Sequence, residues 1–300
     1  MSLKLENSIK LNKEEGDKFA YFIKTQRKKL ISSPIQTTKN AAFSKKDTID
    51  NLLKHNNISE LIINLRQLSY DQFLIEESKF NGIILSKIAE EFDGPKKMLY
   101  NVSNQLYGLE NLSLEEFHKK VITHFGDFAG SISPYIYQLC LSNTQSRRSR
   151  AGKVFETIIY FLYECYGYKY ESQATIGKKT FSKLGLGKVV DSVLPSTKAF
   201  LNFRNKTIVG SMKTTLRERW QEVVEEISRS NLPNIHLLTV DENISVSKAK
   251  QMAEHNIILV VTKSTKANHI LNTMHNVIDF ETYFLKEIPL LMDYWRQHNG

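Results

Sequence analysis

Cysteine is scarce in this sequence, which has only Cys140 and Cys165 among 300 residues. The two lack the paired spacing of a zinc site and fall within apolar helical patterns, so we expect two buried, reduced thiols. A chain of this length needs no disulfide to fold, and the composition fits a reducing cytoplasm. The eight histidines show no HxxH or HExxH spacing. These scarcities argue against a disulfide scaffold, a zinc centre and a histidine metal site.

Long hydrophobic runs are also lacking. No window approaches eighteen consecutive apolar residues, and residues 1–18 have no apolar core of a signal peptide. We therefore expect a cytoplasmic protein without a membrane partner. What the chain does have is basic charge, because 41 Lys and Arg against 32 Asp and Glu give a formal net charge of +9. This excess favours a polyanionic partner, and nucleic acid fits better than a membrane surface.

The first 130 residues have a broken helical periodicity. Apolar residues spaced at 3.6 predict four helices, over Glu14–Leu30, Lys46–His55, Ser59–Phe92 and Leu114–Phe125. No long Ser/Gly linker separates this segment from the rest of the chain. We expect a helical N-terminal subdomain at residues 1–130 and a second domain at residues 131–300.

The second domain has strand signals separated by helical ones. Short β-branched and aromatic runs predict five strands, at Tyr168–Ile176, Val189–Leu194, Thr207–Lys213, Ile235–Val240 and Ile257–Thr262. Helices are expected from Leu216 to Ile227 and from Val246 to Glu254, and an amphipathic helix broken by Pro289 ends the chain. The order αβββαβαβ predicts an α/β fold, a mixed five-stranded sheet flanked by helices.

Three residues of this domain have the chemistry of phosphodiester hydrolysis, which needs a divalent ion held by carboxylates and a cation near the phosphate. Asp191 falls within one expected strand and Lys213 ends the next, while Ser211 stands where a second acid commonly precedes such a lysine. Glu226, on the following helix, can supply that acid. Taken singly, each is more often a strand-edge charge, a solvated base or an ordinary helix glutamate.

The start of that helix adds a second signal. Thr214 and Thr215 are expected to cap it, and Arg217, Glu218 and Arg219 follow at once. In a DNA major groove arginine pairs with guanine and glutamate accepts from cytosine, so this triplet suits a site made of G and C only.

A basic stretch before the sheet is the third candidate. Residues 143–164 are expected to form a polar loop that feeds a helix, with Arg147, Arg148 and Arg150 ahead of the helix N-terminus. Such a loop would clamp a phosphate, since arginine charges and free amides both favour an anion. A merely solubilising loop is an equally good reading.

The segments DSVLPS and SMKTTLRERWQEVVEE, with the Ser/Arg-rich SRAGKVFE, resemble the CCGG-reading family of type II restriction endonucleases, most closely its EcoRII-like branch that cuts CCNGG or CC(A/T)GG. The resemblance implies a PD-(D/E)XK nuclease core and a Mg²⁺ cofactor. It also implies that Asp191, Lys213 and Glu226 are catalytic, with Asp191 and Glu226 holding the metal and Glu156 assisting. Base contacts are then implied for Arg217, Glu218 and Arg219, and on the minor-groove side for Gln145.

The resemblance further implies double-strand cleavage at a palindromic site, with the central nucleotides flipped out. The expected partners are double-stranded DNA and a second copy in a homodimer, with a tetramer left open. A DNA methyltransferase belongs to such a system without being a bound partner, and the system is bacterial or archaeal. The helical N-terminal subdomain would serve DNA contact or dimerisation. Two alternatives remain: a structure-specific repair or recombination nuclease on the same core, and a sequence-specific DNA-binding protein without catalysis.

Overall fold

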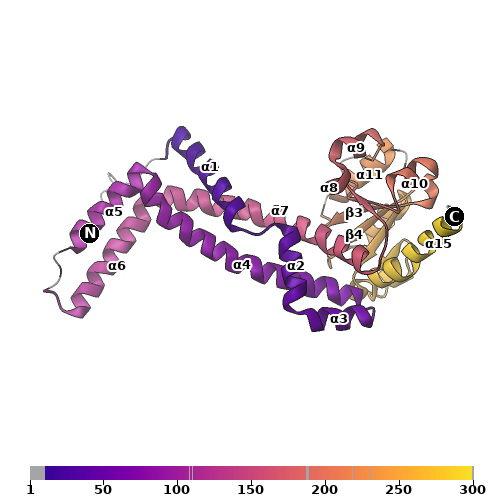
Figure 1. Cartoon of the computed structure of the whole chain (residues 1–300), viewed down its shortest axis with the longest axis horizontal. Coiled ribbons are helices and arrows are strands. Elements are labelled where there is room, and N and C mark those ends of the chain that lie inside the picture. Colours follow the sequence, from indigo (N-terminus) through magenta and orange to yellow (C-terminus); the bar gives the residue numbers. More distant parts are fainter. Residues whose placement is uncertain are drawn as a thin grey trace. The chain divides into compact units, whose positions relative to one another are not determined.

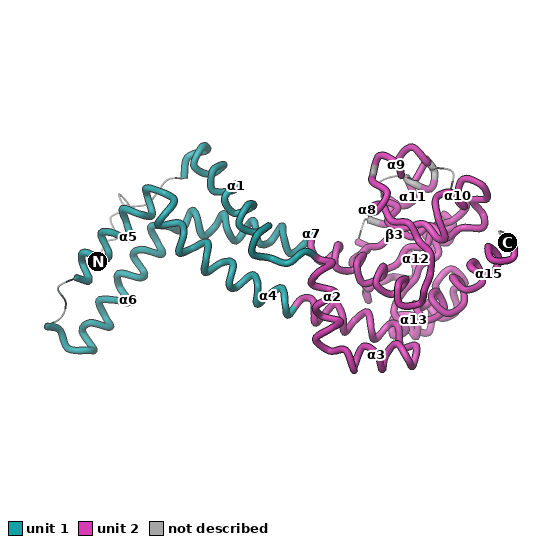
Figure 2. The backbone as a smooth tube through the Cα atoms, in the orientation of Figure 1, with its two compact units in different colours: residues 1–33, 71–149 teal, residues 34–70, 150–300 magenta. Residues whose placement is uncertain are grey.

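The computed structural model describes residues 11–107, 109, 111–186, 189–217, 219–230 and 232–298. The chain forms two compact units, shown in different colours in Figure 2: unit 1 is residues 1–33 and 71–149, and unit 2 is residues 34–70 and 150–300. The units therefore interleave along the chain, whereas the sequence suggested one boundary near residue 130. Residues 34–70, expected in the N-terminal subdomain, belong with the sheet.

Unit 1 is helical. It contains α1 (Lys13–Leu30), α5 (Asp93–Leu106), α6 (Leu114–Ser131), the second part of α4 (Ile58–Glu91) and the first part of α7 (Ser133–Cys165). Its core is built from aromatic and branched side chains, with the Phe19 ring 5.4 Å from Phe92 and 4.9 Å from Tyr135. All four helices expected in the first 130 residues are confirmed. Helix α5 was not expected because Gly94 and Pro95 resemble a break, yet Pro95 lies in its first turn, where no amide donor is needed.

In the described residues, unit 2 is built on a mixed sheet of six strands that lie in chain order. Figure 1 labels two of them, β3 and β4, which are neighbours in the sheet. Strands β1 (Glu171–Ser172), β2 (Ser192–Leu194) and β3 (Ile208–Lys213) pair antiparallel. Strands β4 (Ile235–Thr239), β5 (Ile257–Val261) and β6 (Val277–Asp279) continue from β3 in parallel. The mixed sheet flanked by helices is confirmed, but it has six strands rather than five. The sixth was missed because three residues directly before an apolar helix show no strand periodicity.

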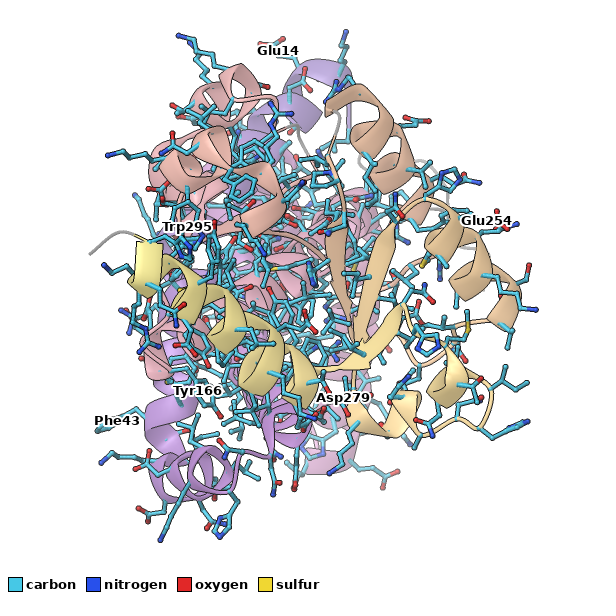
Figure 3. The ribbon with its side chains drawn as sticks, turned by 90° about the vertical axis from the view of Figure 1, so that its right-hand side faces the viewer. Glu14, Phe43, Tyr166, Glu254, Asp279 and Trp295 are labelled. Atoms are coloured by element: carbon cyan, nitrogen blue, oxygen red, sulfur yellow. The ribbon has the colours of Figure 1, made fainter. Side chains whose placement is uncertain are left out.

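Helices cover both faces of this sheet. One face buries Leu194, Ile208 and Leu238 against the second part of α7 and the C-terminal helical residues. The other face buries Val193, Val209 and Leu259 against α11 (Arg219–Ser230) and α12 (Val246–Glu254). Figure 3 shows the strands between the helix carrying Trp295 and the helix carrying Glu254. The strands β2 to β5 bury nearly all of their residues on both faces, which is why their runs are mostly apolar rather than strictly alternating.

Short helices complete unit 2. They are α2 (Pro34–Ser44), α3 (Lys46–Lys54), α8 (Gln173–Ile176), α9 (Lys178–Lys183), α10 (Thr197–Asn202), η2 (Arg204–Lys206), α13 (Lys263–Lys266), η3 (Leu271–Thr273), α14 (Phe280–Thr282), the π-helical turn η4 (Tyr283–Glu287) and α15 (Ile288–His298). The final helix changes to a π-helical turn at Tyr283–Glu287 and resumes as α15, whose second residue is Pro289, so the expected irregularity lies just before this proline. Within the ranges described, no helix is both long and apolar enough to cross a bilayer.

Several local expectations were wrong. The expected strand Tyr168–Ile176 has strand pairing only at Glu171 and Ser172, because Ser172 caps α8 through a reciprocal bond with Thr175. Residues 143–164 lie inside the 33-residue helix α7, with no loop. The first part of this stretch, residues 143–153, looks like a loop because it is polar and basic, but it has no proline to end a helix. Cys140 and Cys165 are exposed rather than buried.

His236 lies at the centre of the sheet, on β4, with 3% of its surface exposed. Among the described residues neither ring nitrogen has a hydrogen-bond partner, and the ring stands 5.5 Å from that of Tyr283. Burial lowers the pKa of His236 to about 4, because the charged imidazolium is poorly solvated there. The folded state therefore holds this side chain neutral.

We expect His236 to make the protein acid-sensitive. The pKa of His236 in the folded state lies below the unfolded value of about 6.5. The free energy of unfolding is therefore unaffected by protonation of this residue above pH 6.5, and it decreases by up to about 3 kcal/mol as the pH falls toward 4. In urea unfolding at pH 7.5 and 4.5, His236→Leu should lose less stability on acidification than wild type. His255→Leu, at an exposed position, should behave as wild type. Equal acid sensitivity of wild type and His236→Leu would contradict this assignment.

Candidate active site

Asp191 lies immediately before β2 rather than inside a strand, and its backbone is fixed by three hydrogen bonds. Its amide donates to the carbonyl of Gly210 at 2.8 Å, and its own carbonyl accepts from the Tyr160 hydroxyl at 2.9 Å and the Gln173 amide at 3.2 Å. Its carboxylate is held as well, because Oδ2 accepts from the Met212 amide at 2.7 Å. The carboxylate therefore has a fixed place beside β3.

Lys213 is the last residue of β3, and its Nζ stands 3.6 Å from Oδ2 of Asp191. The two side chains are only 15% and 11% exposed, so this pair is largely shielded from water. Burial raises the pKa of Asp191 to about 6, although the Lys213 charge opposes this shift. The expected pairing of the acid with the lysine at adjacent strand ends is present.

Glu156 comes from α7 and adds a second carboxylate. Its charge also raises the pKa of Asp191, which places the two acids within electrostatic reach of each other. Lys153, one turn earlier, donates to both Glu156 oxygens at 3.0 and 2.7 Å. Lys153, Glu156 and Tyr160 are spaced by three and four residues, so one face of the helix presents all three toward Asp191.

This donor set suits a hard divalent cation. Carboxylate oxygens are the protein ligands that Mg²⁺ prefers, and a cation between Asp191 and Glu156 would offset the repulsion that raises the pKa of Asp191. Groups of three His, Cys, Asp or Glu side chains that could hold a metal are absent from the described part of the chain. The third expected acid, Glu226, lies on α11, but its side chain falls outside the described residues. Ser211 is fully buried on β3 and brings no charge.

The expected base-reading residues follow β3. Arg217 is exposed and has a φ of 30°, which a non-glycine residue seldom adopts. Glu218 lies outside the described residues, and so does the side chain of Arg219, the first residue of α11. Thr214 and Thr215 do not cap that helix as expected, because α11 begins only at Arg219, three residues beyond Leu216.

The expected phosphate clamp is not at a helix end. Gln145, Arg147, Arg148 and Arg150 all lie inside α7, which begins at Ser133, so no free amides accompany them. Arg147 Nε donates to Glu77 at 2.8 Å, and Arg150 Nη2 donates to Thr37 at 2.5 Å. Gln145 and Arg148 are exposed.

Sequence reasoning missed three residues that hold the site. Tyr160 and Lys153 have a usable signal, because they stand four after and three before Glu156 on a predicted helix. Asp241, two residues after β4, accepts from the Leu216 amide at 2.7 Å and so fixes the chain that leaves β3. It has no comparable sequence signal, because the contact joins segments 25 residues apart.

A buried acid beside the first antiparallel pair of a mixed sheet, with a lysine ending the next strand, defines a nuclease core of the restriction-endonuclease kind. The sequence profile described as EcoRII C terminal matches residues 113–284. The chain belongs to this family and is a type II restriction endonuclease.

Two curated relatives support this assignment. The type II restriction enzyme SsoII of Shigella sonnei is 35% identical over 226 residues, which are 75% of this chain and 67% of that protein. The type II restriction enzyme EcoRII of Escherichia coli is 28% identical over 157 residues, 51% of this chain but only 36% of that protein.

Solved structures agree. Metal-depleted Ecl18kI in complex with uncleaved DNA has a TM-score of 0.71 and 29% identity, covering 93% of this chain and 86% of that one. The complex of restriction endonuclease PspGI with substrate DNA has a TM-score of 0.60, covering 88% and 94%. At 18% identity, the PspGI likeness shows the fold alone. The predicted nuclease fold is confirmed.

We expect Asp191→Asn to stabilise the metal-free protein at alkaline pH. Because the folded pKa of about 6 exceeds the unfolded value near 3.9, ionised Asp191 costs up to about 3 kcal/mol above pH 6, and this cost disappears as the pH falls toward 4. In urea unfolding with EDTA, the free energy of unfolding of the variant should exceed that of wild type at pH 8. The difference should be smaller at pH 5. Asp127→Asn, at an exposed position, serves as the control. A variant less stable than wild type at pH 8 would show that the Lys213 pairing outweighs burial.

Proposed function

We propose that this chain makes Mg²⁺-dependent double-strand cuts in DNA at a palindromic site with CC and GG half-sites, of the CCNGG type. The observation that carries the proposal is the Asp191–Lys213 pair, with its 3.6 Å separation and the Glu156 carboxylate close by. The relation to SsoII and to Ecl18kI, whose structure contains uncleaved DNA, supports DNA as the substrate.

In this proposal the buried pair does the chemistry. Asp191 and Glu226 would hold Mg²⁺, with Glu156 assisting, and the ion would supply charge neutralisation at the scissile phosphate and activation of water. Lys213 orients the attacking water or stabilises the negative charge that develops on phosphorus. Its own position is set by β3, while Tyr160 and the Met212 amide keep Asp191 from turning away. Rigid support of this kind lowers the reorganisation needed in the transition state.

Base selection falls to the turn and helix after β3. Arg217, Glu218 and Arg219 would read guanine and cytosine edges in the major groove, and Gln145 would contact the minor-groove side. Arg148, exposed on α7, is the best candidate for a phosphate contact among the three arginines. Arg147 and Arg150 make bonds to Glu77 and Thr37, which favours a structural role for them. A palindromic site implies a homodimer, with one helix for each half-site.

The proposed catalytic residues can be tested together by digesting plasmid DNA. Lys213→Ala, Asp191→Ala and Glu226→Ala should each abolish cleavage in Mg²⁺, while specific binding changes by less than about tenfold, roughly 1.4 kcal/mol. Discrete fragments from the wild type support the proposal. Cuts only at junctions or damaged strands would favour a repair nuclease, and binding without cleavage would favour a non-catalytic DNA-binding protein.

Lys250→Ala, an exposed position on α12, is the matched control and should cut like the wild type. Sequencing the fragment ends gives the central base and any flanking bases. Wild-type cutting by any of the three variants would remove that residue from the catalytic set.

The central nucleotides are the last part of the proposal. If one nuclease geometry serves both CCGG and CCNGG sites, extruding the central pair would close the half-sites to a common spacing, at a cost of a few kcal/mol. We expect a fluorescent adenine analogue at the central position to brighten when the protein binds in Ca²⁺. The same analogue in a flanking pair should stay quenched. A quenched central analogue, with specific binding confirmed, would mean that the central bases remain stacked.

A further inference from the structure

Asp241 makes three hydrogen bonds just beyond the end of β4. Its Oδ2 accepts from the Leu216 amide at 2.7 Å, and its Oδ1 accepts from the Asn243 amide at 3.0 Å. Its own amide donates to the Thr239 hydroxyl at 3.1 Å. Both carboxylate oxygens and the backbone of Asp241 are therefore engaged, so the side chain cannot rotate without breaking a charge-assisted bond.

The segment that Asp241 holds joins the catalytic strand to the base-reading residues. Lys213 pairs with Thr239 in the parallel register of β3 and β4, and Leu216 comes three residues later. The Leu216 side chain is 1% exposed in the core, so this residue is fixed through both its amide and its side chain. The next residue, Arg217, has a φ of 30°. Non-glycine residues keep such a conformation only where their surroundings impose it.

We propose that Asp241 is a positioning residue for base selection, because it sets the direction in which the chain leaves β3 at Arg217. The inference rests on the proposed function, in which Arg217 reads a base. Hydrogen bonds to base edges tolerate little displacement, so a turn released from Asp241 would present the arginine less accurately. Lys213 is held by strand pairing before the turn. Loss of Asp241 therefore harms discrimination between sites more than it harms phosphodiester cleavage.

The test compares cleavage of two duplexes, one with a CCNGG site and one in which a single C·G pair of that site is replaced. Asp241→Ala should lower the ratio of the two rates by at least about tenfold relative to wild type. Asp241→Asn keeps one oxygen that can accept from Leu216, so it should recover part of the ratio. Exchange of the Leu216 amide with deuterium should be faster in Asp241→Ala.

Asp279→Ala is the matched control, because the Asp279 Oδ1 accepts from the Thr282 amide at 2.7 Å at the end of β6. It loses a similar carboxylate-to-amide bond away from the turn at Arg217 and should keep the wild-type ratio. If the alanine variant of Asp241 does not fold, Asp241→Asn against wild type gives the comparison, with a smaller loss expected.

Two results would overturn the inference. One is a wild-type ratio in Asp241→Ala despite faster exchange at Leu216, and the other is an equal loss of discrimination in Asp279→Ala. Failure of the proposed function would look different, since wild type itself would then cut neither duplex or cut both alike. In that case the proposed role of Asp241 in base selection is rejected together with the proposed function. The deuterium exchange of the Leu216 amide still reports whether Asp241 holds the turn.

Discussion

The antiparallel pairing of β2 with β3 is the constraint on which the site depends. Ser192 lies opposite Gly210, and a side chain added at Gly210 would meet the Ser192 hydroxyl at 2.6 Å. Glycine at this position therefore permits the close approach of the two strands. The same pairing brings the Asp191 carboxylate to the Met212 amide and within 3.6 Å of Lys213. The remaining parts of unit 2 support this junction: α7 adds Glu156 and Tyr160, and the parallel strands extend the sheet beyond Lys213.

Burying this junction has an electrostatic cost and a chemical use. A carboxylate near a second acid, with little water, resists ionisation, and the raised pKa of Asp191 reflects that resistance. A nearby lysine relieves it only in part. The same arrangement creates a place where a divalent cation is favoured, so the property that weakens the metal-free protein prepares it to bind one. His236, on the same sheet, resists protonation instead and remains neutral.

Much of the fold could be predicted from the sequence, because long periodic helices and apolar strands leave strong local patterns. α12 was predicted at its observed bounds, and β3 was displaced by one residue at its start. Asp191, Lys213 and Glu226 were predicted together from chemistry and resemblance, and Glu156 from the resemblance alone. The structure brings Asp191, Lys213 and Glu156 near one another, whereas the Glu226 side chain falls outside the described residues. Features that depend on contacts between distant parts of the sequence were harder to predict. Whether the polar residues 143–153 form a loop or a helix depends on their neighbours, since Arg147 and Arg150 find partners on α4 and α2. Asp241 shows the same limit, because nothing near it in the chain specifies its bond to Leu216.

The interleaving of the two units also orders events during synthesis. Residues 34–70 leave the ribosome early, yet Ile49 and Leu52 pack in the same cluster as Phe155, Phe280 and Ile288. Some partners of this early segment, such as Phe280 and Ile288, are therefore made much later than the segment itself. Until then part of its apolar surface is left to solvent or to a chaperone. The last residue of that cluster, Ile288, comes from α15. A ribosome-bound chain that already contains Asp191 and Lys213 therefore still lacks part of the core that supports them. The core around this pair is thus completed only once Ile288 has been made.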